Sequence, residues 1–179
     1  MRVISGSARG RKLKEAPGFD IRPTSGMVKE SVFNIIQFDI EGRRVLDLYA
    51  GTGQLGIEAL SRGALSAVFV DVNPDAVKLI RENLMLCGFK AAASVFTGDA
   101  VSFLKKDGKF DLIFLDPPYY TPLAETTINK IIQFDKIKTN GIIICETRAD
   151  SVTPPATPPY FLYKEYRYGR VKLIRYGRE

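Results

Sequence analysis

From residue 43 onward, short and nearly continuous apolar runs alternate with longer amphipathic segments. The apolar runs occupy residues 44–48, 67–71, 93–96, 110–115 and 141–145. Strands that are apolar throughout are typical of a parallel sheet with helices on both faces, because every side chain then meets a hydrophobic layer. We therefore predict an α/β fold with a doubly wound, mostly parallel sheet and right-handed crossovers.

The two ends of the chain predict additions to this sheet. Residues 153–159 contain four prolines and predict a loop, after which residues 160–168 and 170–176 predict an antiparallel hairpin at the sheet edge. Ahead of the sheet, apolar residues at helical spacing (28, 32, 35 and 36) predict a helix. The length of 179 residues favours one domain, 1–179, with an N-terminal arm or hairpin (1–20) and a core (21–179).

The composition excludes several kinds of chemistry. The chain has no histidine, which excludes a Ser-His-Asp or Cys-His nucleophile and a His-ligated metal. Its two cysteines, Cys87 and Cys145, form no CxxC motif, so we predict buried thiols in a reducing compartment and no metal site. Since no run of 18 apolar residues occurs, we expect a soluble, cytoplasmic protein without a membrane segment.

The net charge of +6 is concentrated at the two ends of the chain. Residues 1–14 contain five basic residues and no acidic one, and residues 160–179 contain six basic residues against two acidic ones. The segment between them is therefore acidic. Basic ends predict a polyanionic partner, and the alternative is a solvated surface. The N-terminal residues that we predict to contact this partner include Arg2, Arg9, Arg11 and Lys12.

A glycine-rich turn follows the first strand. Gly51, Gly53 and Gly56 match the GxGxxG pattern of nicotinamide dinucleotide sites, and Asp71 ends the next strand. Asp47, however, lies at the mouth of the same turn, where a carboxylate would repel a pyrophosphate. A carboxylate there suits a cationic ligand, and S-adenosylmethionine carries a sulfonium and an ammonium but no phosphate.

Three carboxylates at successive strand ends predict one crevice for this cofactor. Besides Asp47, Asp71 is placed to accept hydrogen bonds from both ribose hydroxyls, and Asp99 to reach the adenine amino group. The alternative is that each of these residues is a helix cap or a turn residue. The predicted cofactor-binding residues are Asp47, Ala50, Gly51, Thr52, Gly53, Asp71, Asp99 and Ala100.

The segment Asp116-Pro117-Pro118-Tyr119 follows the fourth strand. Two prolines remove two N–H donors and leave carbonyl acceptors, while the aspartate adds a carboxylate acceptor. Two such acceptors can bind both hydrogens of a nucleobase amino group and direct its lone pair at a methyl donor, and the tyrosine can stack on the base. We predict that Asp116, Pro117, Pro118 and Tyr119 are catalytic; the alternative is a rigid turn.

These motifs together resemble the RsmD-type methyltransferases, which methylate the 2-amino group of one guanine in 16S ribosomal RNA. The resemblance covers nearly the whole chain and includes residues 22–24, 33–35, 47–64, 70–74, 116–119 and 168–169. Gln54 departs from the pattern, because a small residue is more usual there.

The resemblance implies a Rossmann-like class I methyltransferase fold with seven strands, the last antiparallel. It assigns cofactor binding to Asp47, Gly51, Gly53, Asp71 and Asp99, catalysis to Asp116 and Tyr119, and RNA contact to an arm formed by residues 2–14. The implied partner is 16S ribosomal RNA, which we expect within a small-subunit particle. We also expect the protein to be a monomer.

Several alternatives stay open at this point. An adenine-amino methyltransferase shares the Asp-Pro-Pro-Tyr motif, the glycine pattern fits a nicotinamide-dependent oxidoreductase, and the basic ends fit an RNA chaperone without catalysis. We also predict that Arg22 and Thr24 lie near the cofactor or the target base, although Thr24 fits equally well as a helix cap.

Overall fold

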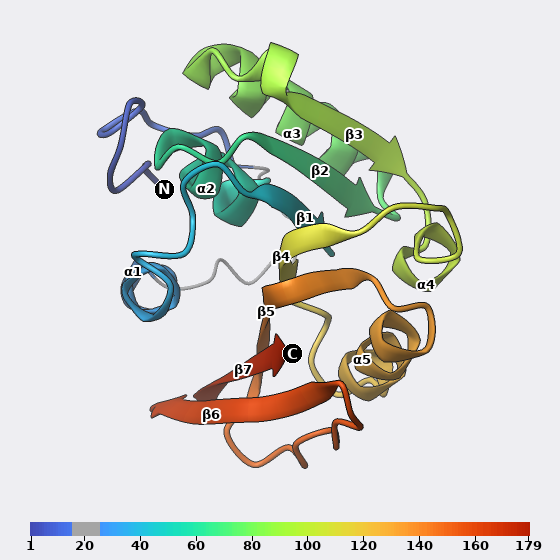
Figure 1. The fold of residues 1–179 in the computed structure, drawn as a ribbon. Helices are drawn as coiled ribbons and strands as arrows, with labels where there is room; N and C mark the ends of the chain where they lie inside the picture. Colours follow the sequence, from blue (N-terminus) through green and yellow to red (C-terminus); the bar gives the residue numbers. More distant parts are fainter. Residues whose placement is uncertain (16–25) are drawn as a thin grey trace.

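The computed structural model describes residues 1–15 and 26–179 (Figure 1). Its helices are α1 (Gly26–Ile35), α2 (Gln54–Ser61), α3 (Pro74–Cys87), α4 (Ala100–Phe103) and α5 (Leu123–Gln133), with a short 3-10 helix η1 (Lys90–Ala92). Its strands are β1 (Arg44–Leu48), β2 (Ser66–Asp71), β3 (Ala93–Thr97), β4 (Phe110–Leu115), β5 (Ile137–Arg148), β6 (Tyr160–Tyr168) and β7 (Val171–Arg178).

The seven strands form one sheet in the order β3-β2-β1-β4-β5-β7-β6. Strands β1 to β5 pair in parallel, whereas β7 pairs antiparallel with both β5 and β6. The predicted mostly parallel sheet with an antiparallel terminal hairpin is therefore confirmed. The order reverses between β1 and β4, and ligands of open α/β sheets bind beyond the carboxyl ends of strands at such a switch point.

Local sequence signals explain where the helices begin and end, and α3 shows this most clearly. Asn73 caps the helix by accepting a hydrogen bond from the Asp75 N–H (2.9 Å), and Pro74 occupies the first helical turn. Gly88 ends the helix with a φ of 78°, a conformation that costs glycine little. This helix has the limits that its sequence predicts.

Helices cover both faces of the sheet, and each face has its own hydrophobic core (Figure 1). On one face, alternate strand residues such as Phe69 and Phe114 pack with α1, α2 and α3. On the other face, residues such as Leu46 and Ile113 pack with α4 and α5. Burial of the strands on both faces accounts for their continuous apolar sequence.

Strand β5 is longer than its apolar run. The sequence predicts a strand over residues 141–145, but β5 begins at Ile137, which is fully buried beside Phe110. The polar residues Lys138–Asn140 separate Ile137 from the apolar run 141–145 and hide this start in the sequence. The pairing register between β5 and β4 also shifts at this point. Helix α4 is shorter than the predicted segment 100–106.

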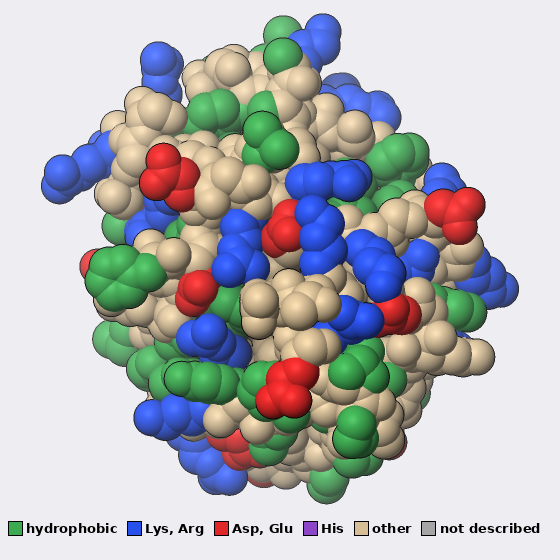
Figure 2. Space-filling view, viewed as in Figure 1, with side chains coloured by type: hydrophobic (Ala, Val, Ile, Leu, Met, Phe, Trp, Pro, Cys, Tyr) green, Lys and Arg blue, Asp and Glu red, His purple; other side chains and the backbone are tan. Residues whose placement is uncertain are grey.

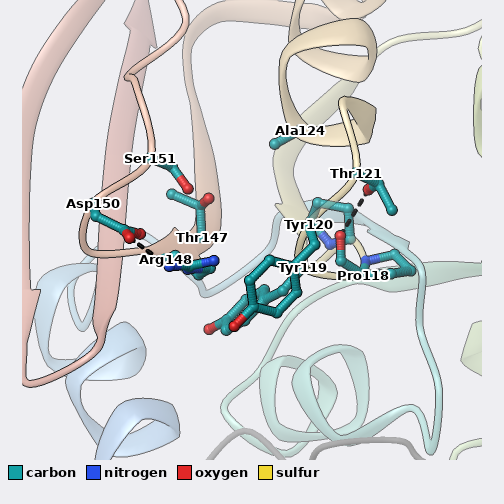
Figure 3. Close-up of a pocket in the computed structure, with 10 residues that line it drawn as sticks. Pro118, Tyr119, Tyr120, Thr121, Ala124, Thr147, Arg148, Asp150 and Ser151 are labelled. Atoms are coloured by element: carbon teal, nitrogen blue, oxygen red, sulfur yellow. Dashed lines mark hydrogen bonds and ion pairs between the residues drawn. The ribbon is translucent and has the colours of Figure 1, made fainter.

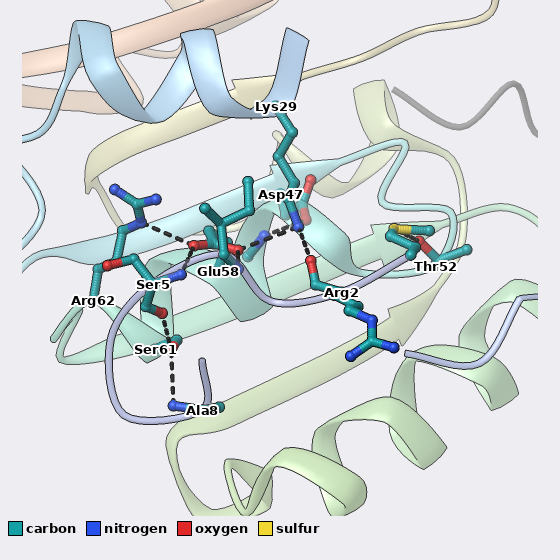
Figure 4. Close-up of polar contacts among 12 residues, drawn as sticks. Arg2, Ser5, Ala8, Lys29, Asp47, Thr52, Glu58, Ser61 and Arg62 are labelled. Carbon is teal, nitrogen blue, oxygen red and sulfur yellow. Dashed lines mark hydrogen bonds and ion pairs between the residues drawn. The ribbon is translucent and has the colours of Figure 1, made fainter. Parts of the chain in front are cut away.

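The N-terminal arm, residues 1–15, forms a hairpin that packs onto α2 (Figure 4). Val3, Ala8 and Leu13 are buried, while the four basic residues predicted to contact the partner (Arg2, Arg9, Arg11 and Lys12) are exposed. The predicted boundary of the arm at residue 20 lies outside the described residues. The arm is thus part of a hydrophobic core, with its charges on the outside.

A buried carboxylate on α2, that of Glu58, holds the arm in place. It accepts hydrogen bonds from the backbone N–H groups of Ile4 (2.8 Å) and Ser5 (2.9 Å), and it pairs with Lys29 (3.2 Å) and Arg62 (3.0 Å). Lys29 in turn donates to the Arg2 carbonyl at 2.7 Å. These contacts join the arm, α1 and α2 through one ion cluster (Figure 4).

The next segment of the arm lies directly against the backbone of α2. A Cβ atom on Gly6 would lie 1.7 Å from the Ser61 carbonyl oxygen, so no larger residue fits there without moving the arm. The Ser7 N–H donates to the same oxygen at 2.8 Å.

Basic and acidic side chains alternate in the centre of the face shown in Figure 2. At the amino-terminal edge of the sheet such neighbours form ion pairs. Asp111 binds Lys138 (3.1 Å), Asp39 lies between Arg43 (3.4 Å) and Arg175 (3.5 Å), and Asp135 binds Lys109 and Arg178. Within the described residues, no helix has the length and apolar character needed to cross a membrane.

Candidate active site

A cavity of about 510 Å³ opens at the carboxyl edge of the sheet, where β1, β2, β4 and β5 end. This volume falls in the range of small-molecule sites. Most of the residues predicted for cofactor binding and catalysis line it: Asp47, Ala50, Gly51, Thr52, Asp71, Asp116, Pro117, Pro118 and Tyr119. The structure therefore brings the glycine turn and the Asp-Pro-Pro-Tyr turn to one space.

Asp47 is a buried carboxyl group near the end of β1. Its Oδ2 accepts a hydrogen bond from the Gly56 N–H at 2.9 Å. Burial raises the pKa of Asp47 to about 8, and the negative charge of Asp71 adds to this effect. A buried carboxyl group that lines a cavity stabilises a cationic ligand, because a nearby positive charge favours its ionised form.

Asp71 ends β2 and is held by the backbone on both sides. Its Oδ2 accepts from the Gly51 N–H (2.8 Å) and its Oδ1 from the Asn73 N–H (2.9 Å). One carboxylate thus fixes the glycine turn against the next helix. Each of its oxygens has further lone pairs, which suits the binding of vicinal hydroxyl groups.

The start of α2 closes one side of the cavity. A Cβ atom on Gly56 would lie 2.3 Å from the Phe69 ring and 3.1 Å from Asp47 Oδ2, so only glycine lets the helix approach β1 and β2 this closely. Gln54, two residues earlier, lines the cavity with 8% of its surface exposed. Its buried Oε1 accepts no hydrogen bond from the residues that the structure describes.

The Asp-Pro-Pro-Tyr turn forms the opposite side, directly after β4. The hydroxyl of Tyr119 donates a hydrogen bond to Glu146 Oε1 at 2.9 Å, and Glu146 also lines the cavity from β5. The Pro118 carbonyl oxygen accepts from the Thr121 hydroxyl at 2.7 Å. These bonds fix the tyrosine ring and the turn before any substrate arrives.

Comparison with known proteins identifies the family. The model of the family described as "Conserved hypothetical protein 95" matches residues 1–177. The chain belongs to this family. It is 38% identical to the putative rRNA methyltransferase YlbH of Bacillus subtilis, with 98% of each chain covered. It is 36% identical to ribosomal RNA small subunit methyltransferase D of Haemophilus influenzae, covering 98% of this chain and 93% of that protein.

A solved structure extends the comparison to three dimensions. The putative methyltransferase yhhF of Escherichia coli superposes with a TM-score of 0.87 at 33% identity, covering 100% of this chain and 98% of that one. The predicted resemblance to the RsmD-type methyltransferases and the predicted Rossmann-like class I methyltransferase fold are both confirmed.

Within this family fold, three predicted cofactor residues lie outside the lining of the cavity. Gly53 precedes α2, and Ala100 is buried at the start of α4. Asp99 caps α4 by accepting a hydrogen bond from the Ser102 N–H at 2.7 Å. Cofactor binding by these three residues stays a prediction. Arg22 and Thr24 lie outside the described residues, so their predicted roles also stay open.

Sequence reasoning missed several residues of the cavity wall. Glu146, in β5, follows the buried run Ile142–Cys145 directly, so its position just after the predicted strand 141–145 was the available signal. Tyr49 also lines the cavity, and its hydroxyl forms a hydrogen bond with the Thr127 hydroxyl at 2.8 Å. Among the described residues, no group of three or more Asp, Glu, Cys or His side chains is placed to hold a metal ion.

The residues present fit S-adenosylmethionine. The buried carboxyl group of Asp47 suits a cationic centre, and that of Asp71 suits ribose hydroxyls. The buried Oε1 of Gln54 has no hydrogen-bond partner among the described residues, so it can accept a hydrogen bond from a ligand. A dinucleotide fits this edge less well, because its pyrophosphate would face Asp47 and Asp71 together.

Proposed function

We propose that this protein transfers a methyl group from S-adenosylmethionine to the 2-amino group of one guanine in 16S ribosomal RNA. The observation that carries the proposal is the shared cavity, which is lined by Asp47 and Asp71 on one side and by Asp116 to Tyr119 on the other. Two bound reactants that meet in one cavity gain most of their rate from proximity and orientation. The name of the Haemophilus relative supports a small-subunit ribosomal RNA target, and that of the Bacillus relative supports a ribosomal RNA target.

The cofactor supplies the methyl group from its sulfonium centre. In the proposal, Asp47 stabilises its positive charge, Asp71 accepts hydrogen bonds from its ribose, and the turn residues Ala50–Thr52 line the space that it occupies. Gly53 remains a predicted cofactor-binding residue. Asp99 remains the predicted contact of its adenine, and Ala100 remains a predicted cofactor-binding residue.

The acceptor nitrogen is a poor nucleophile, since its lone pair is delocalised into the guanine ring. Asp116 and a proline carbonyl bind its two hydrogens and turn the lone pair toward the methyl group. We assign the second acceptor to Pro117, because the Pro118 carbonyl oxygen already accepts a hydrogen bond from Thr121. The nitrogen gains a methyl group and loses one proton, which passes to Asp116 or to solvent. Tyr119, held by Glu146, stacks on the base.

Two other activities fit the site less well. An adenine-amino methyltransferase would use the same turn, but reading DNA bases in a groove needs additional structure, and residues 1–15 and 26–179 form one sheet, its helices and a short arm. A nicotinamide-dependent oxidoreductase would place a pyrophosphate against Asp47 and Asp71. We further propose that the chain is one domain that acts as a monomer, without a metal, on small-subunit particles in the cytoplasm, with Arg2, Arg9, Arg11 and Lys12 contacting RNA.

Tritiated methyl transfer to hypomethylated small subunits tests the proposal, followed by mapping of the modified nucleotide. We expect the label in 16S ribosomal RNA as a single N2-methylguanine. Label in adenine would favour the second activity, and the absence of transfer with cofactor bound would contradict the proposal.

A further inference from the structure

A second cavity of about 270 Å³ adjoins the first, and the two share the wall formed by Pro117 to Tyr120. Figure 3 shows residues 118–121 and 124 on one side of this cavity and residues 147, 148, 150 and 151, from the end of β5 and the loop after it, on the other. The methyl donor of the proposed function occupies the first cavity. The second therefore lies where the acceptor base has to enter.

Tyr120 has a conformation that stability alone does not favour. Its φ is 63°, in the left-handed region that residues other than glycine rarely adopt. Its surface is 85% exposed. An exposed tyrosine in a strained turn gains little from burial. An aromatic ring at such a position is suited to contact with a ligand.

Arg148 lies over this ring, with its guanidinium carbon 4.2 Å from the ring centre. Its Nη2 donates to Asp150, and 31% of the side chain is exposed. A guanidinium has five N–H donors in a planar fork, so the ion pair leaves donors for a ligand. The ring below and the carboxylate beside it hold this fork in one orientation.

The loop behind Arg148 is anchored from β7. The buried Lys172 donates to the Ser151 carbonyl oxygen (2.6 Å) and to the Thr153 hydroxyl (2.8 Å). The Ser151 N–H donates to the Arg148 carbonyl at 3.1 Å. The guanidinium is therefore presented by a fixed wall rather than by a loose side chain.

We propose that Arg148, held on Tyr120, is the residue that selects guanine, by donating two hydrogen bonds to its O6 and N7 atoms. This inference rests on the proposed function, which places the 2-amino group at Asp116. On guanine, the 2-amino group and the O6/N7 edge lie on opposite sides of the base. That arrangement matches a turn that has Asp116 at its start and, at its end, Tyr120 with Arg148 stacked on it (Figure 3).

The chemistry of the two purines explains why this pairing selects one of them. Guanine presents two acceptors, O6 and N7, which match the parallel donors of a guanidinium. Adenine presents N7 beside an amino donor, which would face a donor of Arg148. A bidentate arginine–guanine contact discriminates by about 1–3 kcal/mol, or about 5- to 150-fold in rate.

The test compares two acceptor bases in the same RNA. Small subunits are assembled with a 16S RNA that carries either guanine or 2-aminopurine at the methylated position. The analogue keeps the 2-amino group but lacks O6. We expect the wild-type protein to prefer guanine in kcat/KM. Arg148→Met should reduce this preference by about 5- to 150-fold, mainly by losing activity on guanine.

Two variants serve as controls. Arg175 makes the same kind of stack on Tyr163 (4.4 Å) away from both cavities, so Arg175→Met should keep the guanine preference even if it is less stable. Arg148→Lys keeps the charge but not the fork, and its preference should lie between those of wild type and Arg148→Met. Near-UV circular dichroism checks folding, and if Arg148→Met does not fold, the lysine variant decides.

An equal loss on both bases, or a preference unchanged by either Arg148 variant, would overturn the inference. Either result would leave the proposed function intact, since guanine would still be methylated. Failure of the wild-type protein to methylate guanine would instead contradict the proposed function itself.

Discussion

The two edges of the sheet both carry aspartates, but they hold them in opposite ways. At the amino edge, Asp111 and Asp135 are bound by lysine and arginine side chains. At the carboxyl edge, Asp47 and Asp71 accept hydrogen bonds from backbone N–H groups, and no ion pair joins either of them to a Lys or Arg within residues 1–15 and 26–179. The carboxyl groups of the second edge therefore stay available to pair with a cationic ligand, whereas those of the first edge are already paired.

The acid–base properties follow the same division. The hydrogen bond from Lys109 lowers the pKa of Asp135, and Tyr160 and Arg178 lower it further. Burial raises the pKa of Asp111, but hydrogen bonds from Arg44 and Lys138 outweigh this and hold it below its ordinary value. The pKa of Asp47 is shifted in the opposite direction, to about 8. Carboxyl groups with raised pKa values cluster at functional sites, whereas paired ones mainly stabilise the fold.

The largest difference between the edges should be seen in catalysis. We expect Asp116→Asn to lower methyl transfer about 100-fold or more, because the amide has no negative charge and replaces one acceptor oxygen of the carboxylate with an NH2 donor. Cofactor affinity, measured by equilibrium titration, should stay within about threefold because the side chain is needed in the transfer step. The matched variant Asp111→Asn at the amino edge should keep its activity, and equal losses in both variants would abolish the distinction.

Basic residues offer a second contrast. Replacing Arg9, Arg11 and Lys12 by Ala should weaken RNA binding and reduce the slope of log affinity against log salt by about one unit for each phosphate that the protein no longer binds. Lys109→Ala and Lys138→Ala remove lysines that are already paired with aspartates, so they should leave the slope unchanged. Filter binding at several salt concentrations measures both, and an unchanged slope in the arm variant would show that the arm faces solvent.

The proton on Asp47 should make the ligand-free protein less stable as the pH rises. The folded protein keeps this proton up to about pH 8. In the unfolded chain Asp47 has its ordinary pKa of 3.8, so the proton is released at a lower pH. Between these values the folded state binds more protons, so the free energy of unfolding falls as pH increases. The melting temperature should fall by up to about 3–5 °C per pH unit.

The variant Asp47→Asn isolates this contribution. Its melting temperature, followed by circular dichroism between pH 5 and 8, should depend less on pH than that of the wild type. The same slope in both proteins would mean that Asp47 is ionised in the folded state.

The smallest effect belongs to the amino edge, where the sign is reversed. Because the pKa of Asp135 is lowered in the folded state, this residue stabilises the fold at pH values above its ordinary pKa of 3.8. The stabilisation is lost as the pH falls through the lowered pKa. Asp135 is partly exposed, so Asp135→Asn should cost only about 0.2–1 kcal/mol at pH 7. Urea unfolding should show a smaller cost at pH 3 than at pH 7.

Much of the fold could be predicted from local patterns. Five strands follow from apolar runs, because a strand buried on both faces has no alternation to obscure it. The Asp-Pro-Pro-Tyr turn was placed correctly at the end of β4, since its position after the run Phe110–Leu115 fixes the sheet edge at which it lies.

The cavity wall was harder to predict, because it depends on packing between distant segments. Nothing in the local sequence shows that Glu146 accepts a hydrogen bond from the Tyr119 hydroxyl, or that Arg148 stacks on Tyr120. The same limit applies to the aspartates. Asp111 and Asp47 each lie within a buried strand, and only their place along it decides whether they meet a lysine or the cavity.

Calorimetric titration with S-adenosylmethionine and with NADH tests most directly whether the carboxyl edge holds a cationic cofactor. We expect saturable binding of S-adenosylmethionine, with proton release near pH 7 that Asp47→Asn abolishes, and no binding of NADH. Tight binding of NADH without binding of S-adenosylmethionine would contradict the assignment of this edge.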